Sequence, residues 1–214
     1  MKVVITGSSR GIGREVAVKF LKEGHQVIGL DCNLATIDDV NYTHIQCDIS
    51  KDIPDIEDVE ILINNAGVQN TGSDIDINLK GTIAVTEKYA MQDKIKAVVF
   101  MASASASTGS EFPEYVASKG GIVAYMKNVA LRIAQYGATS NSISAGGVIT
   151  ELNQHIIDSP ILWEQVLNET LLNKWATKSE IADFTYFVAV NNKSMTGQDL
   201  FIDNGEALKA NFIW

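Results

Sequence analysis

The sequence predicts an α/β protein with a doubly wound parallel sheet, folded as one domain over residues 1–214. Apolar segments of strand length alternate with helical segments from the first residue onward. This alternation is typical of βαβ units, in which helices cover both faces of a parallel sheet. The length leaves no room for a second full domain, because domains span roughly 100–200 residues. No repeat, linker or low-complexity segment divides the chain.

The first half of the chain begins with a buried strand at 1–6, which an amphipathic helix at 12–23 follows. Three further short strands are expected at 26–31, 44–48 and 61–64, where apolar residues form runs of strand length.

In the second half, a helix at 77–91 leads to an apolar strand at 97–101. The longest helical segment, rich in Ala, Val, Tyr and Met, covers 113–135. The last two strands are expected at 141–145 and 199–203.

The composition is that of an acidic globular protein. Hydrophobic residues make up 46% of the chain and charged residues 20%, and the mean hydropathy is close to zero. These values exclude a disordered or fibrous protein. The formal net charge of −9 repels phosphate backbones and anionic lipids, so neither nucleic acid nor a membrane is an expected partner. No apolar run approaches the ~18–20 residues of a membrane span, and the first residues lack a signal-peptide core.

Two cysteines, Cys32 and Cys47, make a poor disulfide framework and lie in no metal-type cluster. We expect both to be reduced thiols in the core, which favours a cytoplasmic location. The histidines at positions 25, 44 and 155 form no ligand spacing and are expected at the surface or in loops. No metal site is therefore expected.

A glycine-rich turn joins the first strand to the first helix, the context in which such a motif binds a dinucleotide. Gly7 permits a tight turn, Gly11 lets a pyrophosphate approach the backbone, and Gly13 allows helix and strand to pack closely. The phosphate then lies on free amides at the helix N-terminus, where the helix dipole favours an anion. The alternative is an ordinary βα turn that happens to be rich in glycine.

Two residues near this turn bear on the choice of cofactor. Asp31 ends the second strand, where a carboxylate accepts hydrogen bonds from the adenosine ribose and repels a 2′-phosphate. Arg10 opposes this preference, because a cation in the glycine turn could pair with that phosphate. Burying a carboxylate against a phosphate is the costlier arrangement, so we expect NAD(H) to be favoured over NADP(H).

With its later motifs added, the sequence resembles the short-chain dehydrogenase/reductase family in its compact, single-domain, Rossmann-like form. The match covers nearly the whole chain, and its strongest part is Asn-Asn-Ala-Gly followed by Tyr-x-x-x-Lys. The matching segments are 6–13, 47–49, 64–67, 77–79, Ser103, 115–119, 146–150 and 196–203.

Tyr115 and Lys119 lie four residues apart on one predicted helix, so their side chains share a face. A free phenol has a pKa of about 10, and a neighbouring ammonium lowers that pKa towards neutrality. The alternative is an ordinary amphipathic helix in which the Tyr115 ring is buried and the Lys119 amine lies in solvent. The resemblance implies that Tyr115 exchanges a proton with the reacting oxygen and that Lys119 also holds the nicotinamide ribose. It implies further that Ser103 bonds that oxygen, with Ser105 as second choice, and that Asn78 supports a proton path.

The resemblance also implies which residues contact the cofactor. Asp48 matches the position that bonds the adenine, and Thr150 matches a contact to the carboxamide. Ala145 replaces the usual proline there, which loosens the loop. The cofactor-binding set comprises Gly7, Ser9, Arg10, Gly11, Ile12, Gly13, Asp31, Asp48, Ile49, Asn65, Ala66, Gly67, Tyr115, Lys119, Val148 and Thr150.

The sequence departs from the family in two places. Asn78 lies only eleven positions after Gly67, so a helix and its loops are missing beside the substrate cleft. A lid for the substrate is expected around 151–178, where the sequence is rich in Leu, Ile and Trp. These residues form either an apolar substrate wall or a helix that packs on its own core. No Arg or Lys cluster precedes Lys174 there, so a strongly anionic substrate is not suggested.

The expected function is an oxidoreductase that transfers a hydride between a nicotinamide cofactor and a small, fairly apolar ketone or secondary alcohol. The alternative is a nucleotide-sensing protein that keeps the cofactor cleft without turnover. The family commonly pairs the helices that carry Asn78 and Tyr115, which implies a homodimer or homotetramer. The apolar tail at 207–214 is expected to dock on the core or on a second subunit.

Overall fold

The computed structural model describes residues 1–208 of the chain. The docking expected of the tail at 207–214 falls mostly on residues 209–214, which lie outside the described residues. No helix within the described residues is long and apolar enough to cross a membrane.

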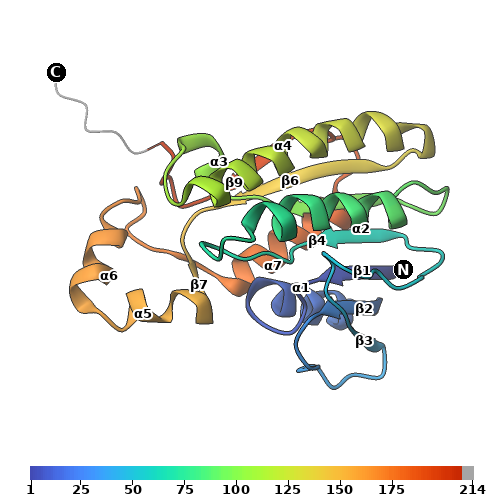
Figure 1. The fold of residues 1–214 in the computed structure, drawn as a ribbon, viewed down its shortest axis with the longest axis horizontal. Coiled ribbons are helices and arrows are strands. Elements are labelled where there is room, and N and C mark those ends of the chain that lie inside the picture. Colours follow the sequence, from blue (N-terminus) through green and yellow to red (C-terminus); the bar gives the residue numbers. More distant parts are fainter. Residues whose placement is uncertain (209–214) are drawn as a thin grey trace.

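A seven-stranded parallel sheet forms the centre of the molecule, with the order β3-β2-β1-β4-β5-β6-β9 (Figure 1). All seven strands expected from the sequence are present, with shifts of at most two residues at their ends. They are β1 (Lys2–Thr6), β2 (Gln26–Asp31), β3 (Tyr42–Gln46), β4 (Ile61–Asn64), β5 (Ala97–Met101), β6 (Thr139–Ala145) and β9 (Asp199–Ile202). The doubly wound α/β prediction is therefore confirmed.

Helices cover both faces of this sheet (Figure 1). On one face, α1 (Gly11–Lys22) and α7 (Lys178–Tyr186) pack on an apolar cluster that includes Phe20 and Ile181. On the other face, α2 (Thr82–Tyr89) and α4 (Pro113–Ile133) pack on a second cluster that includes Val85 and Met126. The π-helical segment η1 (Ile75–Gly81) leads directly into α2, and together they form the helix expected at 77–91. The 3-10 turn η2 (Ala134–Tyr136) ends α4, and the π-helical segment η4 (Phe187–Asn191) ends α7.

The segment at 151–178, in which the sequence predicts a lid, lies beside the sheet, not on it (Figure 1). The short strand β7 (Val148–Ile149) precedes this segment and pairs with β8 (Ala176–Thr177) near its end. Between them lie the 3-10 turn η3 (Glu151–Asn153) and two short helices, α5 (Gln154–Ile157) and α6 (Pro160–Leu167). Several of the large apolar side chains here are exposed, with Leu152 61% and Ile161 72% exposed, and most of the others are half-buried. The segment therefore does not bury a core of its own, although Trp175 is buried and contacts Trp163 edge to face.

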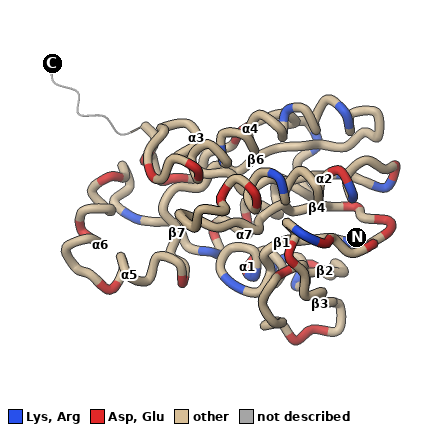
Figure 2. Tube along the Cα trace, viewed as in Figure 1, with Lys and Arg blue, Asp and Glu red and all other residues tan. Residues whose placement is uncertain are grey.

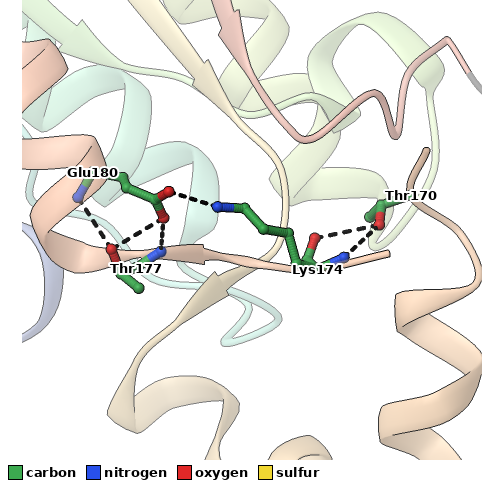
Figure 3. Close-up of polar contacts among 4 residues, drawn as sticks. All are labelled: Thr170, Lys174, Thr177 and Glu180. Carbon is green, nitrogen blue, oxygen red and sulfur yellow. Dashed lines mark hydrogen bonds and ion pairs between the residues drawn. The ribbon is translucent and has the colours of Figure 1, made fainter. Parts of the chain in front are cut away.

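The end of the lid is fixed to α7 by polar contacts (Figure 3). The Thr177 side chain accepts from the Glu180 amide, and the Glu180 carboxylate accepts from the Thr177 amide at 2.7 Å. Lys174 Nζ pairs with the same carboxylate at 2.6 Å, and the Lys174 amide donates to Thr170 Oγ1 at 3.1 Å. These contacts make the β8–α7 junction a firm base from which the rest of the lid extends.

The expectation for the two cysteines is wrong. Cys32 is exposed and Cys47 is only half-buried, so neither is a core thiol, although both are free. Cys32 follows β2 and Cys47 follows β3, so both lie just beyond the strand ends. His25 lies in a loop, as expected, but it is buried against Phe20 and Tyr186.

Candidate active site

The glycine turn after β1 lies where the strand order reverses, since β1 is flanked by β2 and β4. Ligands of open α/β sheets bind at the carboxyl ends of the strands at such a point. Gly7 has a φ of +71°, a left-handed conformation that glycine adopts without strain. A Cβ added to Gly13 would lie 2.1 Å from the Gly7 carbonyl oxygen. Helix α1 can approach the turn this closely only because residue 13 has no side chain.

The end of β4 holds the turn in place. Asn65 Nδ2 donates to the carbonyl oxygens of Thr6 at 3.0 Å and Gly7 at 3.1 Å. The Ala66 amide donates to Thr6 Oγ1 at 2.9 Å. Asn65 and Ala66 are therefore structural partners of the glycine turn as well as predicted neighbours of the cofactor.

The start of α1 has the properties of a phosphate site. Its N-cap residue Arg10 is exposed and makes no side-chain capping bond, and the first turn contains no acidic residue. The buried Ser9 Oγ has no hydrogen-bond partner within residues 1–208. Free amides, an unpaired hydroxyl and the open backbone at Gly11 fit the phosphates of a dinucleotide.

A carboxylate from the lid lies against this same helix start. Glu151 Oε2 would lie 3.9 Å from a Cβ added at Gly11, and Glu151 pairs with Lys178 at 2.6 Å. The bond with Lys178 is the main reason why the pKa of Glu151 lies below its usual value. A carboxylate of the protein itself thus lies beside the amides that the motif offers to a phosphate.

Asp31 is buried at the end of β2 and is firmly oriented. Its Oδ2 accepts from the Ser9 amide at 2.9 Å, and its Oδ1 accepts from the Asn33 amide at 2.8 Å and from Asn33 Nδ2 at 2.9 Å. Burial alone would raise the pKa of Asp31, but these hydrogen bonds outweigh it and lower that pKa. Asp31 is therefore a carboxylate at neutral pH.

The other predicted cofactor contacts lie around the same edge of the sheet. Asp48 pairs with Lys51 at 2.8 Å, and this bond is the main reason why the pKa of Asp48 falls to about 2. The Ile49 side chain is buried against Gly81, so it packs in the core. Val148 is buried in β7, and Thr150 is the N-cap of η3.

Tyr115 lies in the first turn of α4, beside the residues that follow β5. Ser103 lies close enough to its hydroxyl to lower the pKa of Tyr115. Ser105 lies behind, since Ser105 Oγ donates to Ser103 Oγ at 2.9 Å. Burial and the nearby Glu111 carboxylate raise the pKa of Tyr115 to about 12, against the lowering effect of Ser103. The expectation that Lys119 lowers this pKa is therefore wrong for the structure without cofactor.

Lys119 is buried one turn further along α4. Its Nζ donates to the Met101 carbonyl oxygen at 2.8 Å and lies 5.6 Å from the centroid of the Tyr115 ring. Burial lowers the pKa of Lys119 to about 8, although Glu111 acts in the opposite direction. Because Lys119 loses its proton near pH 8, it is already neutral in the range where Tyr115 titrates, which explains why it does not lower the pKa of Tyr115.

Asn78 lies in η1 beside Lys119. It accepts from the Val68 amide at 2.8 Å and donates to the Val68 carbonyl at 2.9 Å and to Ser118 Oγ at 3.0 Å. A Cβ added to Gly67 would lie 3.1 Å from Asn78 Oδ1 and 3.7 Å from Lys119 Nζ. The structure thus brings Gly67, Asn78 and Lys119 together.

The burial of Lys119 predicts a pH dependence of stability in the cofactor-free protein. Its pKa is about 8 in the folded state and 10.5 as the ordinary value. Between these values the unfolded chain binds more protons, so the free energy of unfolding rises with pH from about 8 towards 10. Urea unfolding across this range should show a rise that Lys119→Met lacks. Identical pH profiles for the two proteins would contradict the burial of a titrating amine.

The sequence did not identify two further residues beside Tyr115. Gln69, in the shortened segment before η1, donates to the Glu111 carboxylate at 2.6 Å. Glu111 precedes α4 and has a φ of +81°, which is unusual for a residue with a side chain. No motif marks this pair, because its residues are 42 positions apart and meet only in the folded chain.

Comparison with known proteins identifies the class to which this fold and site belong. A family model described as "Enoyl-(Acyl carrier protein) reductase" matches residues 7–206. The chain therefore belongs to the short-chain dehydrogenase/reductase family, as its motifs predicted. It is an oxidoreductase that acts with a nicotinamide cofactor on CH–OH or carbonyl groups.

Particular relatives are similar over nearly their whole length. The chain is 27% identical to a glucose 1-dehydrogenase of Gluconobacter oxydans, over 99% of this chain and 93% of that protein. It is 25% identical to the 3-oxoacyl-[acyl-carrier-protein] reductase FabG of Staphylococcus aureus, over 94% and 96%. A structure of a 4-hydroxyisoleucine dehydrogenase mutant with NADH and succinate has a TM-score of 0.88 at 25% identity, over 99% of this chain and 100% of that one. The first alignment spans 251 positions, more than the 214 residues of this chain, as expected if segments are missing here.

Proposed function

We propose that the protein is an NAD(H)-dependent carbonyl reductase or alcohol dehydrogenase for a small, fairly apolar ketone or secondary alcohol. The observation that carries this proposal is the placement of Tyr115 beside Ser103, with Lys119 one turn away. When bound, the cofactor supplies or accepts the hydride. An assay of NADH oxidation with a panel of small ketones tests the proposal, and absence of turnover with all of them would contradict it.

Ser103 and Tyr115 have separate roles at the reacting oxygen. Ser103 donates or accepts a hydrogen bond there, and Tyr115 exchanges the proton. A Tyr115 pKa near 12 keeps the phenol protonated at neutral pH, and this is the form that gives a proton to a carbonyl oxygen. Lys119 is placed to hold the nicotinamide ribose, and Asn78 fixes the backbone at Val68 beside it.

The preference for NAD(H) rests on Asp31. It remains ionised in a buried position, and its partners Ser9 and Asn33 leave it no freedom to turn away. A 2′-phosphate beside this carboxylate would lack a compensating charge unless Arg10 turned towards it. We therefore keep Asp31 as the determinant and Arg10 as the competing residue. The relatives include structures with NADH and with NADPH.

We infer that a bound cofactor phosphate displaces the Glu151 carboxylate from its position beside Gly11. We expect Glu151→Gln to bind NADH more tightly by roughly two- to tenfold, because a negative charge leaves the helix N-terminus. Fluorescence titration measures this change. Glu164→Gln on α6, another exposed lid glutamate, is the matched control and should bind NADH as the unmodified protein does. Unchanged or weaker binding by Glu151→Gln would show that Glu151 does not compete with the cofactor.

The assembly and the location follow the family pattern. We propose a homodimer or homotetramer that pairs the helices carrying Asn78 and Tyr115, and the 79% exposed Leu131 on α4 supports an apolar contact there.

We propose a cytoplasmic location, which two free cysteines support. A nucleotide-sensing protein without turnover is not favoured, since the relatives are named dehydrogenases and reductases. The segment 151–178 is proposed as the substrate lid, with its exposed apolar residues available to a substrate.

A further inference from the structure

Glu111 lies next to the catalytic tyrosine, and the proposed mechanism gives it no role. It is four residues before Tyr115, in the loop between α3 (Ser105–Thr108) and α4. This loop follows β5, the strand that also leads to Ser103, so Glu111 lies at the carboxyl edge of the sheet where the reacting oxygen is bound. Acidic positions lie close to α3 in the tube view (Figure 2).

The shortened segment before η1 fixes the Glu111 carboxylate. Gln69 Nε2 donates to Glu111 Oε2 at 2.6 Å. That segment is itself held by Asp74, whose carboxylate accepts from the amides of Asn70 at 2.8 Å and Thr71 at 2.9 Å. A short loop thus replaces the helix that the sequence lacks before η1, and this loop positions the Glu111 carboxylate.

The charge of Glu111 acts on the catalytic residues. It raises the pKa of Tyr115 and opposes the lowering of the pKa of Lys119. Burial raises the pKa of Glu111, and the carboxylate of Glu206, which accepts from the Gly147 amide at 3.1 Å, adds to this rise. Glu111 forms no ion pair within residues 1–208, and its one hydrogen bond leaves acceptor capacity on the carboxylate.

We infer that Glu111 is a specificity-determining residue, which selects alcohols or ketones that carry a hydrogen-bond donor next to the reacting carbon. Such a donor is a hydroxyl or an ammonium group. A carboxylate at the same position is repelled by Glu111 and Glu206. The rest of the substrate stays apolar and faces the lid, so the inference deepens the proposed function and rests on it.

A series of four nearly isosteric secondary alcohols tests this inference. The series is 2-butanol, 1,2-propanediol, 1-amino-2-propanol and 3-hydroxybutyrate. These compounds differ only in the group on the carbon next to the reacting carbon, which is a methyl, a hydroxyl, an ammonium or a carboxylate group, respectively. We expect kcat/KM with the hydroxyl or the ammonium compound to exceed that with 2-butanol by on the order of tenfold, as for a hydrogen bond to a charged acceptor. The larger of the two values identifies the donor, and 3-hydroxybutyrate should be the poorest substrate.

Glu111→Gln keeps the shape of the side chain and removes its charge. We expect this variant to lose the preference for the ammonium compound and to gain activity with 3-hydroxybutyrate, while its NADH affinity stays unchanged. Glu114→Gln, an exposed acid three residues further along, is the matched control and should keep the original order.

Different results would contradict the specificity role of Glu111 and the proposed function. If Glu111→Gln lowers kcat/KM equally for all four alcohols, Glu111 only holds the loop and the inference is wrong. If 2-butanol is preferred by the unmodified protein, the inference is also wrong, although the proposed function stands. Turnover of none of the four alcohols, with NADH bound normally, would overturn the proposed function itself.

Discussion

Tyr115→Phe should lower kcat/KM by roughly 10²–10⁴-fold, the usual contribution of a positioned general acid or base. The substitution removes one oxygen, the one that lies beside Ser103, and leaves the ring beside Lys119. NADH affinity should change by less than about twofold, because the ring and Lys119 keep their places. Steady-state kinetics and a fluorescence titration on the same preparation separate the two effects.

Tyr125→Phe is the matched control, since it makes the same change on the same helix. The Tyr125 hydroxyl donates to Glu87 at 2.7 Å, away from Ser103. This variant should keep most of its activity. If Tyr115→Phe were as active as Tyr125→Phe, Tyr115 could not be the proton donor, and the mechanism would have to be assigned to another group.

Gly13→Ala should have the largest effect on the cofactor site. The added Cβ would lie 2.1 Å from the Gly7 carbonyl oxygen and 2.3 Å from Asn65 Nδ2. Because the closest of these atoms is backbone, the turn or the helix must move. We expect the free energy of unfolding to fall by about 1–3 kcal/mol. Each kcal/mol lost should lower Tm by roughly 2–4 °C. NADH affinity should fall more than tenfold, since the phosphate site is built from the same turn.

Gly120→Ala serves as the control for this substitution. Gly120 lies in helix α4, and an added Cβ there meets nothing within 4 Å. Alanine has the higher helix propensity, so Tm should stay constant or rise. A Gly13→Ala protein with unchanged Tm and NADH affinity would contradict the close packing of α1 on the turn.

The sheet could be predicted because its central strands are buried on both faces. The five residues of β5, Ala97–Met101, are all buried, and such a strand has an unbroken apolar sequence. Helix α7 was not predicted, although Thr177 and Glu180 form a capping box that marks its start. The bounds of the short helices between β7 and β8 were not predicted either, since their apolar residues are exposed or half-buried and follow no core-directed pattern.

The positions of the motif residues could be predicted more completely than their electrostatics. The spacing of Tyr115 and Lys119 placed both side chains on one face of α4, where the structure has them. The pKa of Tyr115 could not be predicted, since it depends on burial and on Glu111. Glu111 in turn is positioned by Gln69, a contact between segments far apart in the sequence.

The proposed function depends most directly on cofactor binding at the glycine turn. Fluorescence titration of the purified protein with NADH and with NADPH tests this binding. We predict that both bind and that NADH binds more tightly, because Asp31 is ionised and fixed at the end of β2. Tighter NADPH binding would mean that Arg10 determines the preference, and the cofactor assignment would be reversed. If neither nucleotide bound at sub-millimolar concentration, the turn would not be a dinucleotide site and the proposed function would be contradicted.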